Sequence, residues 1–329
     1  MQKFLLVTTI LLLAFSCKDG KSSKDEPFLL DATGKINDVS VVVDNELWSG
    51  NVGEAIRYVL TLPVFGLPQD EPSFNINQIP PQVFSGFVTK NRTVLKIEKG
   101  KAPSISFDNN IYARPQRVIT VSGNTNLEII DLINENASKI ISTFRNIELH
   151  HKQQQIRKVL FNTQAIQDQL NLDIDFTTAY SIRVNEDNGF FWIRRDTETG
   201  FLCLLLYELP YDAIKRNDST SVISQIIKIR DSIGEKYIKG PIEGSYMDTE
   251  DAYTPFNTEI VLDNKPTLET KGMWDVENYV MAGPFINYAI EDQKNNRWVI
   301  AEGFVFAPGV EKRDFVFELE AIIKSIEIK

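Results

Sequence analysis

The stretch Phe201-Leu-Cys-Leu-Leu-Leu-Tyr207 decides the fold of the second half, because an unbroken apolar run of this length predicts a buried strand. Two more strands are predicted just before it, at residues 179–185 and 190–196. The intervening turns, 185–189 and 196–200, each end in glycine, which suits tight hairpins. These segments together predict a unit of three antiparallel strands.

Outward from this unit, the second half continues as a helix, three more strands and a closing helix. The expected bounds are 219–238 for the first helix, 258–262, 285–291 and 297–306 for the strands, and 313–326 for the last helix. The order βββ-α-βββ-α predicts an antiparallel sheet with helices packed on one face.

The first half has a similar but looser order of elements. Residues 126–170 contain no glycine or proline and keep a helical period, which predicts one long helix capped by Asn126, or two helices with a break near 149–152. The chain is thus predicted to be an α+β protein of two two-layer sandwiches, at 31–170 and 171–329. The other elements expected in the first half are a helix at 48–62 and strands at 38–44, 74–79, 93–98, 104–107, 111–113 and 117–120.

The N-terminus has the three parts of a bacterial lipoprotein signal peptide. Lys3 gives a positive start, residues 4–15 are almost all apolar, and Ala14-Phe15-Ser16-Cys17 ends the run with small residues before a cysteine. An apolar run of about 12 residues is too short to span a bilayer, which needs roughly 20. We therefore expect cleavage after residue 16. The other interpretation is an ordinary secretory signal that happens to contain a cysteine.

Cys17 is accordingly the expected site of lipid attachment. It would carry a thioether-linked diacylglycerol and an N-acyl chain such as palmitate, and several acyl chains together anchor a protein firmly. Residues 17–30 form the predicted flexible tether, since 18–27 contain no apolar residue. The predicted location is the cell outer membrane. Lys18-Asp19 favours the cell surface but Gly20 interrupts that signal, so the periplasmic face stays open.

Composition limits the remaining classes of function. Apolar residues make up 43% of the chain and charged residues 24%, as in folded proteins. The net charge of −10 argues against nucleic acid as a partner, so attachment to the membrane must come from the lipid. No metal or other cofactor is expected, because the only histidines, His150 and His151, point about 100° apart on a helix. Cys203 is expected to be a buried, inert thiol.

Carboxylates supply the one catalytic hypothesis. Asp248, Glu250 and Asp251 gather in the loop 240–255, where paired acids could serve glycoside hydrolysis or hold calcium. The regular spacing of a calcium loop is missing, and acidic loops are common on a chain of this charge. A solvated loop or a protein-binding loop is the preferred interpretation.

Aromatic residues supply a binding hypothesis in the same region. If Tyr246, Tyr253, Phe256, Trp274, Tyr279 and Phe285 gather at one end of the sheet, they could form a platform for a glycan or a peptide. The competing interpretation, which we favour, is that they close the core where the helix layer is thin. The candidate binding loop therefore comprises Tyr246, Asp248, Glu250, Asp251, Tyr253, Trp274 and Phe285.

Several segments together resemble one family of bacterial lipoproteins, the domain of unknown function 4837. They are Ile36-Asn-Asp-Val-Ser-Val-Val-Val-Asp44, Gln78-Ile-Pro-Pro81, Tyr237-Ile-Lys-Gly-Pro241, Gly244-Ser-Tyr-Met247, Lys271-Gly-Met-Trp274, Met281-Ala-Gly-Pro-Phe285 and Glu302-Gly-Phe-Val-Phe-Ala-Pro308. The resemblance covers nearly all of the mature chain. It implies an exported lipoprotein of a Gram-negative envelope, and it implies no activity, cofactor or catalytic residue.

The function expected from these observations is that of a non-catalytic binding or assembly protein of the outer membrane. Its partner would be an envelope protein or a surface polymer, and its membrane contact would be the lipid anchor. The alternative is a carboxylate-dependent hydrolase that acts on envelope carbohydrate, so the question of enzymatic activity stays open at this point.

Overall fold

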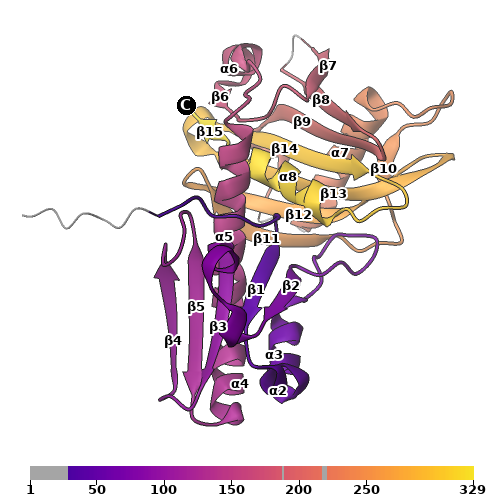
Figure 1. The fold of residues 1–329 in the computed structure, drawn as a ribbon. Helices are drawn as coiled ribbons and strands as arrows, with labels where there is room; N and C mark the ends of the chain where they lie inside the picture. The colour runs from indigo at the N-terminus through magenta and orange to yellow at the C-terminus, as the bar shows by residue number, and fades with distance from the viewer. Residues whose placement is uncertain (1–28, 187–188, 217–220) are drawn as a thin grey trace, which may run out of the picture.

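The computed structural model describes residues 29–186, 189–216 and 221–329. The predicted signal peptide, Cys17 and the tether as far as residue 28 lie outside the described residues. Two large sheets dominate the described chain, one of five strands and one of eight (Figure 1). A two-stranded sheet of β6 (Leu172–Asp173) and β15 (Glu327–Ile328) lies beside the larger one. The predicted α+β class is confirmed.

The five-stranded sheet has the order β2-β1-β3-β5-β4, and its first four strands are parallel. Only β4 is antiparallel, to β5. The expectation of an antiparallel sheet is therefore wrong for the first half. The reason is that long connections, rather than hairpins, join β1 to β2 and β2 to β3, and such crossovers return the chain to the same end of the sheet. The strands are β1 (Asp38–Val42), β2 (Asn75–Ile79), β3 (Thr93–Lys99), β4 (Ser104–Asn109) and β5 (Arg117–Gly123).

Helices cover one face of this sheet, as predicted. They are α2 (Asn45–Ser49), α3 (Asn51–Leu60), α4 (Asn126–Glu135) and α5 (Ala137–Ile156), and their apolar side chains share a core with the inward residues of β1, β3 and β5. The long helical segment breaks at Asn136 and again over 157–163, not near 149–152. At the first break the side-chain amide of Asn136 donates 2.8 Å to the Leu132 carbonyl and caps the end of α4. Thr125, not Asn126, caps α4, through a capping box with Glu128.

The eight-stranded sheet is antiparallel throughout and has the order β10-β12-β13-β14-β9-β8-β7, with β11 also paired to β12. Strand β12 was not predicted, because Pro266 and Gly272 interrupt it and its apolar residues form no run. The strands are β7 (Ser181–Asn185), β8 (Phe191–Thr197), β9 (Gly200–Pro210), β10 (Met247–Thr249), β11 (Phe256–Leu262), β12 (Lys265–Val276), β13 (Tyr279–Asp292) and β14 (Arg297–Phe306).

Helices cover both faces of this larger sheet. In β9, Leu202, Leu204 and Leu206 lie in the core beneath α8 (Arg313–Ile323), whereas Cys203 and Leu205 lie in the core beneath α7 (Val222–Tyr237). The expectation of helices on one face is therefore wrong for the second half. A strand that is apolar at successive positions has two buried faces, and the quoted run 201–207 already carried that information.

Helix α5 joins the two halves. It runs beside the first sheet and reaches α8 of the second half (Figure 1). Arg145 of α5 forms an ion pair with Glu320 of α8, and Lys152 lies 2.7 Å from Glu318. Glu71 accepts hydrogen bonds from the backbone amides of Lys312 and Arg313 at the start of α8. The short helix α6 (Gln164–Leu170) packs into the core of the larger sheet. The domain boundary after residue 170 stays a prediction.

Candidate functional site

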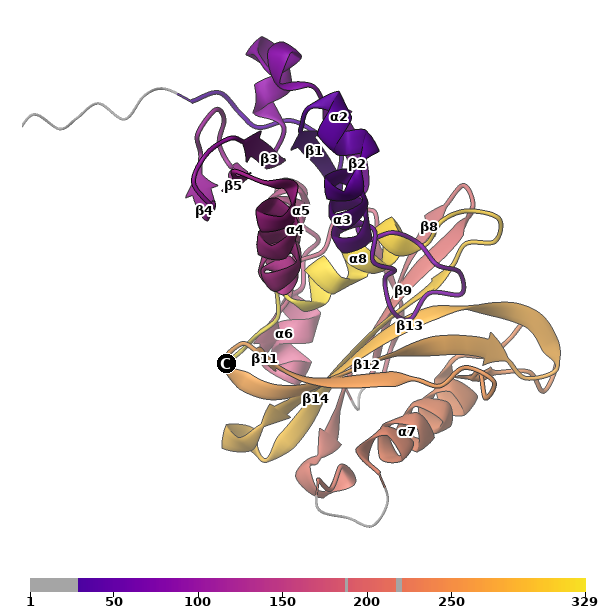
Figure 2. The same ribbon diagram turned by 90° about the horizontal axis from the view of Figure 1, so that it is seen from below.

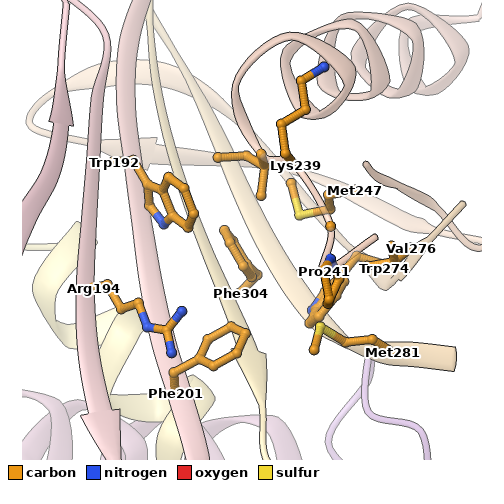
Figure 3. A pocket seen from close by; sticks show the side chains of 12 residues that line it. Trp192, Arg194, Phe201, Lys239, Pro241, Met247, Trp274, Val276, Met281 and Phe304 are labelled. Carbon is orange, nitrogen blue, oxygen red and sulfur yellow. The ribbon is translucent and has the colours of Figure 1, made fainter. Parts of the chain in front are cut away.

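A pocket opens on the face of the larger sheet that α7 covers. Strands β8 and β9 form one side of it, and β10, β12 and the segment after α7 form the other (Figure 3). Its volume is about 190 Å³, below the roughly 300–1,000 Å³ of typical small-molecule sites. The lining residues are Trp192, Arg194, Phe201, Ile238, Lys239, Gly240, Pro241, Met247, Trp274, Val276, Met281 and Phe304.

The polar atoms of the two tryptophans are already satisfied inside the protein. Trp274 is 1% exposed, and its indole N–H donates 3.2 Å to the carbonyl of Val305. The Trp192 indole donates to Sγ of Cys203 at 3.2 Å. Because both N–H groups are used internally, the rings offer only apolar surface to the pocket.

Arg194 supplies the one cation that points into the pocket. Its guanidinium lies 4.0 Å from the ring centroid of Phe201, a cation–π contact, and 2.6 Å from Asp196. Lys239 points away from the pocket in Figure 3 and donates to the carbonyl of Glu235. The pocket can therefore hold an apolar group the size of one side chain, with a paired guanidinium at its edge.

The predicted aromatic residues do not lie together on the surface: Phe256 and Tyr279 are 46% and 41% exposed, whereas the other four are half-buried or buried. Trp274 and Phe285 are each 1% exposed and belong to the core beneath α7, and only Trp274 lines the pocket. The guanidinium of Arg230 lies 3.9 Å from the Phe285 ring centroid and covers it. Tyr246 and Tyr253 are half-buried and lie outside the pocket lining. Trp274 and Phe285 therefore close the core, as in the interpretation that we favoured from the sequence.

The predicted carboxylates do not converge on the pocket either. Asp248 is half-buried on β10, Asp251 is exposed, and Glu250 accepts a local hydrogen bond from the Ala252 amide at 2.9 Å. The partner of Asp248 is Asp231 of α7, a residue that was not among the predicted site residues. Burial raises the pKa of Asp231 to about 6, and its hydrogen bond to the Asp248 carboxyl acts in the same direction.

Asp231 belongs to a network of polar side chains beneath α7. The Thr249 hydroxyl donates 2.6 Å to Asp231 and accepts 2.7 Å from Arg230. Arg230 also forms an ion pair of 2.9 Å with Glu302, and both side chains are 1% exposed. Asn287 donates 3.0 Å to the same carboxylate of Glu302. The network ties α7 to β10, β13 and β14. The sequence offered one sign of this network: Arg230 lies among the apolar positions of the predicted helix 219–238.

Two classes of site find no support in the described residues. Within 29–186, 189–216 and 221–329, no group of three or more histidine, cysteine or acidic side chains could hold a metal ion. No helix in these same ranges is both long and apolar enough to cross a membrane.

The fold and the pocket define an α+β protein with a small apolar pocket and a buried polar network under one helix. A family model described as "Domain of unknown function (DUF4837)" matches residues 159–325, just over half of the 329 residues. The chain belongs to this family, which confirms the suspected resemblance. Residues 32–157 match a second model, "Domain of unknown function (DUF8532)", so the segments quoted from the first half fall in another family. No curated protein matches the chain.

Proposed function

We propose that this protein is a lipoprotein of the bacterial outer membrane that binds an envelope protein without catalysing a reaction. Cys17 carries the lipid anchor, and the pocket on the α7 side of the larger sheet receives an apolar side chain of the partner. The proposal rests on the pocket. Its walls are largely aromatic and methionine side chains, and the N–H groups of Trp192 and Trp274 are already hydrogen-bonded within the protein.

The size and chemistry of the pocket favour a protein side chain over a polymer. A volume of about 190 Å³ accommodates one apolar side chain rather than a sugar chain. Burial of one such side chain contributes about 1.5–3 kcal/mol, so further contacts around the pocket must add to the affinity. Exposed residues at the opening, among them Lys239 and Pro241, are placed to make those contacts.

The anchor explains how an acidic protein stays at a membrane. The net charge of −10 opposes attraction to anionic lipid, so several acyl chains on Cys17 would supply the attachment. The outer membrane is the proposed location, and the lean toward the cell surface rests on Lys18-Asp19. Labelling with a clickable fatty acid tests the anchor: the wild type should be labelled, and the Cys17→Ser variant should not.

In-cell photo-crosslinking tests the pocket. A photoreactive amino acid in place of Met281, which is half-buried in the pocket wall, should capture one envelope protein. The control position is Val261, which is 73% exposed and lies on the distant edge strand β11. Trp192→Ala should abolish the adduct at position 281. Identical adducts at both positions, or none at 281, would overturn the proposal.

The alternative, a carboxylate-dependent hydrolase, has one observation in its favour, the raised pKa of Asp231. The geometry opposes it, because neither Asp231 nor Asp248 lines the pocket, and Glu250 and Asp251 do not line it either. An Asp248→Asn variant that lost a measured hydrolysis of envelope carbohydrate would revive it.

A further inference from the structure

Of the exposed apolar side chains of the first half, five lie in three segments that are bonded to one another: Leu30, Val83, Phe87, Val88 and Ile111, which we call the N-terminal rim. Their exposed fractions are 48%, 57%, 71%, 40% and 48% in that order. Scattered apolar residues are common on protein surfaces, but a group of five within three short segments calls for a partner.

Backbone and side-chain hydrogen bonds hold these three segments together. The Thr33 amide donates 2.8 Å to Lys90, and the Ala32 amide donates 2.9 Å to Arg114. The Gln116 side chain donates 2.7 Å to the carbonyls of both Thr89 and Asn91. The rim is therefore a fixed surface of the folded protein.

Phe84 and Tyr112, the chain neighbours of Val83 and Ile111, pack on the face of the first sheet opposite to its helices. The connection from β2 to β3, which contains Val83, Phe87 and Val88, crosses this face, and Phe84 packs there against Val42 and Val94. In Figure 2 the connection stands out at the top, beyond the sheet, while α4 and α5 lie below it.

The described chain begins beside this surface. Leu29 is the first described residue, and the neighbouring Leu30 carbonyl accepts 2.9 Å from the Arg114 amide. Cys17 lies 12 residues earlier in the sequence. Twelve residues span at most roughly 40–43 Å in any conformation, so a lipid on Cys17 would keep the rim near the bilayer at a high effective concentration.

One lysine beside the rim also suits a lipid surface. The ammonium group of Lys90 lies 5.5 Å from the ring centroid of Phe87, so an aromatic ring and a cation stand side by side. At the boundary of a bilayer, such a ring enters the region between headgroups and acyl chains while the lysine stays with the phosphates.

We propose that the N-terminal rim contacts the surface of the bilayer that carries the lipid anchor. The partner is the headgroup layer, with Phe87 and Val88 inserted and Lys90 against the phosphates. This inference rests on the proposed lipid anchor, and it goes beyond that anchor because it fixes which face of the folded protein meets the membrane.

The test uses the full lipidated chain in vesicles of phosphatidylethanolamine and phosphatidylglycerol. An environment-sensitive fluorophore is attached at Phe87→Cys or, as a control, at Val261→Cys, which is 73% exposed on β11. Cys203 is buried and does not compete for the label. Lipids with a spin label near the headgroup should quench position 87 at least about twofold, since an interfacial segment reaches about 5–10 Å into the boundary. Position 261 should not change.

A second variant removes the contact without touching the core. With the fluorophore at Ile111→Cys, the exposed substitutions Phe87→Ser and Val88→Ser should abolish the quenching while the protein still floats with the vesicles. Floating protein that is not quenched at position 87 would overturn the contact and leave the anchor intact. Protein that carries no fatty acid and does not float would overturn the anchor, and this inference with it.

Discussion

The carboxyl of Asp231 on α7 is an ionisable group whose pKa is shifted by the packing around it. Its pKa is raised to about 6 by burial and by the hydrogen bond to Asp248, against the lowering effect of the Thr249 hydroxyl. For an acid with a raised pKa, the stabilising contribution is complete below the unfolded pKa of about 3.9 and is lost as the pH rises through about 6.

Removal of the partner carboxyl should therefore lower the pKa of Asp231. In an Asp248→Asn variant, carbon NMR titration of the aspartate carboxyls should show the resonance near pH 6 move to lower pH. The exposed Asp251→Asn variant is the matched control and should leave that resonance in place. An unchanged titration in Asp248→Asn would contradict the pairing.

The thiol of Cys203 gives a second prediction at this scale. Burial raises its pKa to about 12, and the Trp192 indole covers Sγ at 3.2 Å. A thiol reagent should therefore not modify the native protein at neutral pH. Trp192→Ala removes the cover from the side of the pocket, so modification should become measurable by mass spectrometry, whereas Tyr58→Ala, on the exposed face of α3, should change nothing. Equal rates of Cys203 modification in the two variants would show that the Trp192 indole does not shield the thiol.

Helix α7 is held against the larger sheet by a buried ion pair between Arg230 and Glu302. Burial raises the pKa of Glu302, and the charge of Arg230 and the Asn287 amide oppose this shift. Arg230→Met leaves Glu302 buried without its partner, and such losses cost about 3–5 kcal/mol in the free energy of unfolding.

Urea denaturation measures this loss. Lys101→Met is the control, since Lys101 is 62% exposed and its pair with Glu98 should contribute no more than about 1 kcal/mol. The double variant Arg230→Met and Glu302→Leu should recover most of the stability, because no uncompensated charge remains. A double variant as unstable as Arg230→Met alone would show that packing, not charge, causes the loss.

The sequence predicted elements that have a local apolar run or period, and it missed those that are defined by contacts with distant segments. Strand β9 was predicted from its apolar run, and α8 from its period. Strand β12 was missed, because its partners β11 and β13, rather than its own residues, define it. The parallel pairing of the first sheet was missed for a related reason: the direction of a strand is set by the path of the connection before it. The pocket brings together residues from β8 to β14, which no local pattern could indicate.

At the scale of the whole molecule, the contact between α5 and α8 should fail in acid. Burial alone would raise the pKa of Glu320, but the charges of Arg145, Lys324 and Lys271 outweigh it and hold this pKa at about 2. A lowered carboxylate pKa stabilises the fold above the unfolded value of about 4.3, and this contribution is lost as the pH falls toward 2.

The free energy of unfolding should therefore drop between about pH 4.5 and pH 2, by on the order of 3 kcal/mol from Glu320. Chemical denaturation at a series of pH values measures it, and Glu320→Gln should flatten the profile in this window while being less stable at pH 7. The control is Glu243→Gln, on an exposed turn. A variant profile with the same slope as the wild type would contradict the assignment.

The layers of the molecule stack in one direction, with the β2–β3 connection at one extreme and α7 at the other (Figure 2). A body that stands on this connection would hold α7, and with it the side of the larger sheet on which the pocket opens, away from its support. Partners in the same leaflet would then meet the flanks of the protein, and the pocket would be left to molecules that approach from the aqueous side. A pocket ligand should accordingly be sought among soluble or peripheral proteins rather than among integral ones.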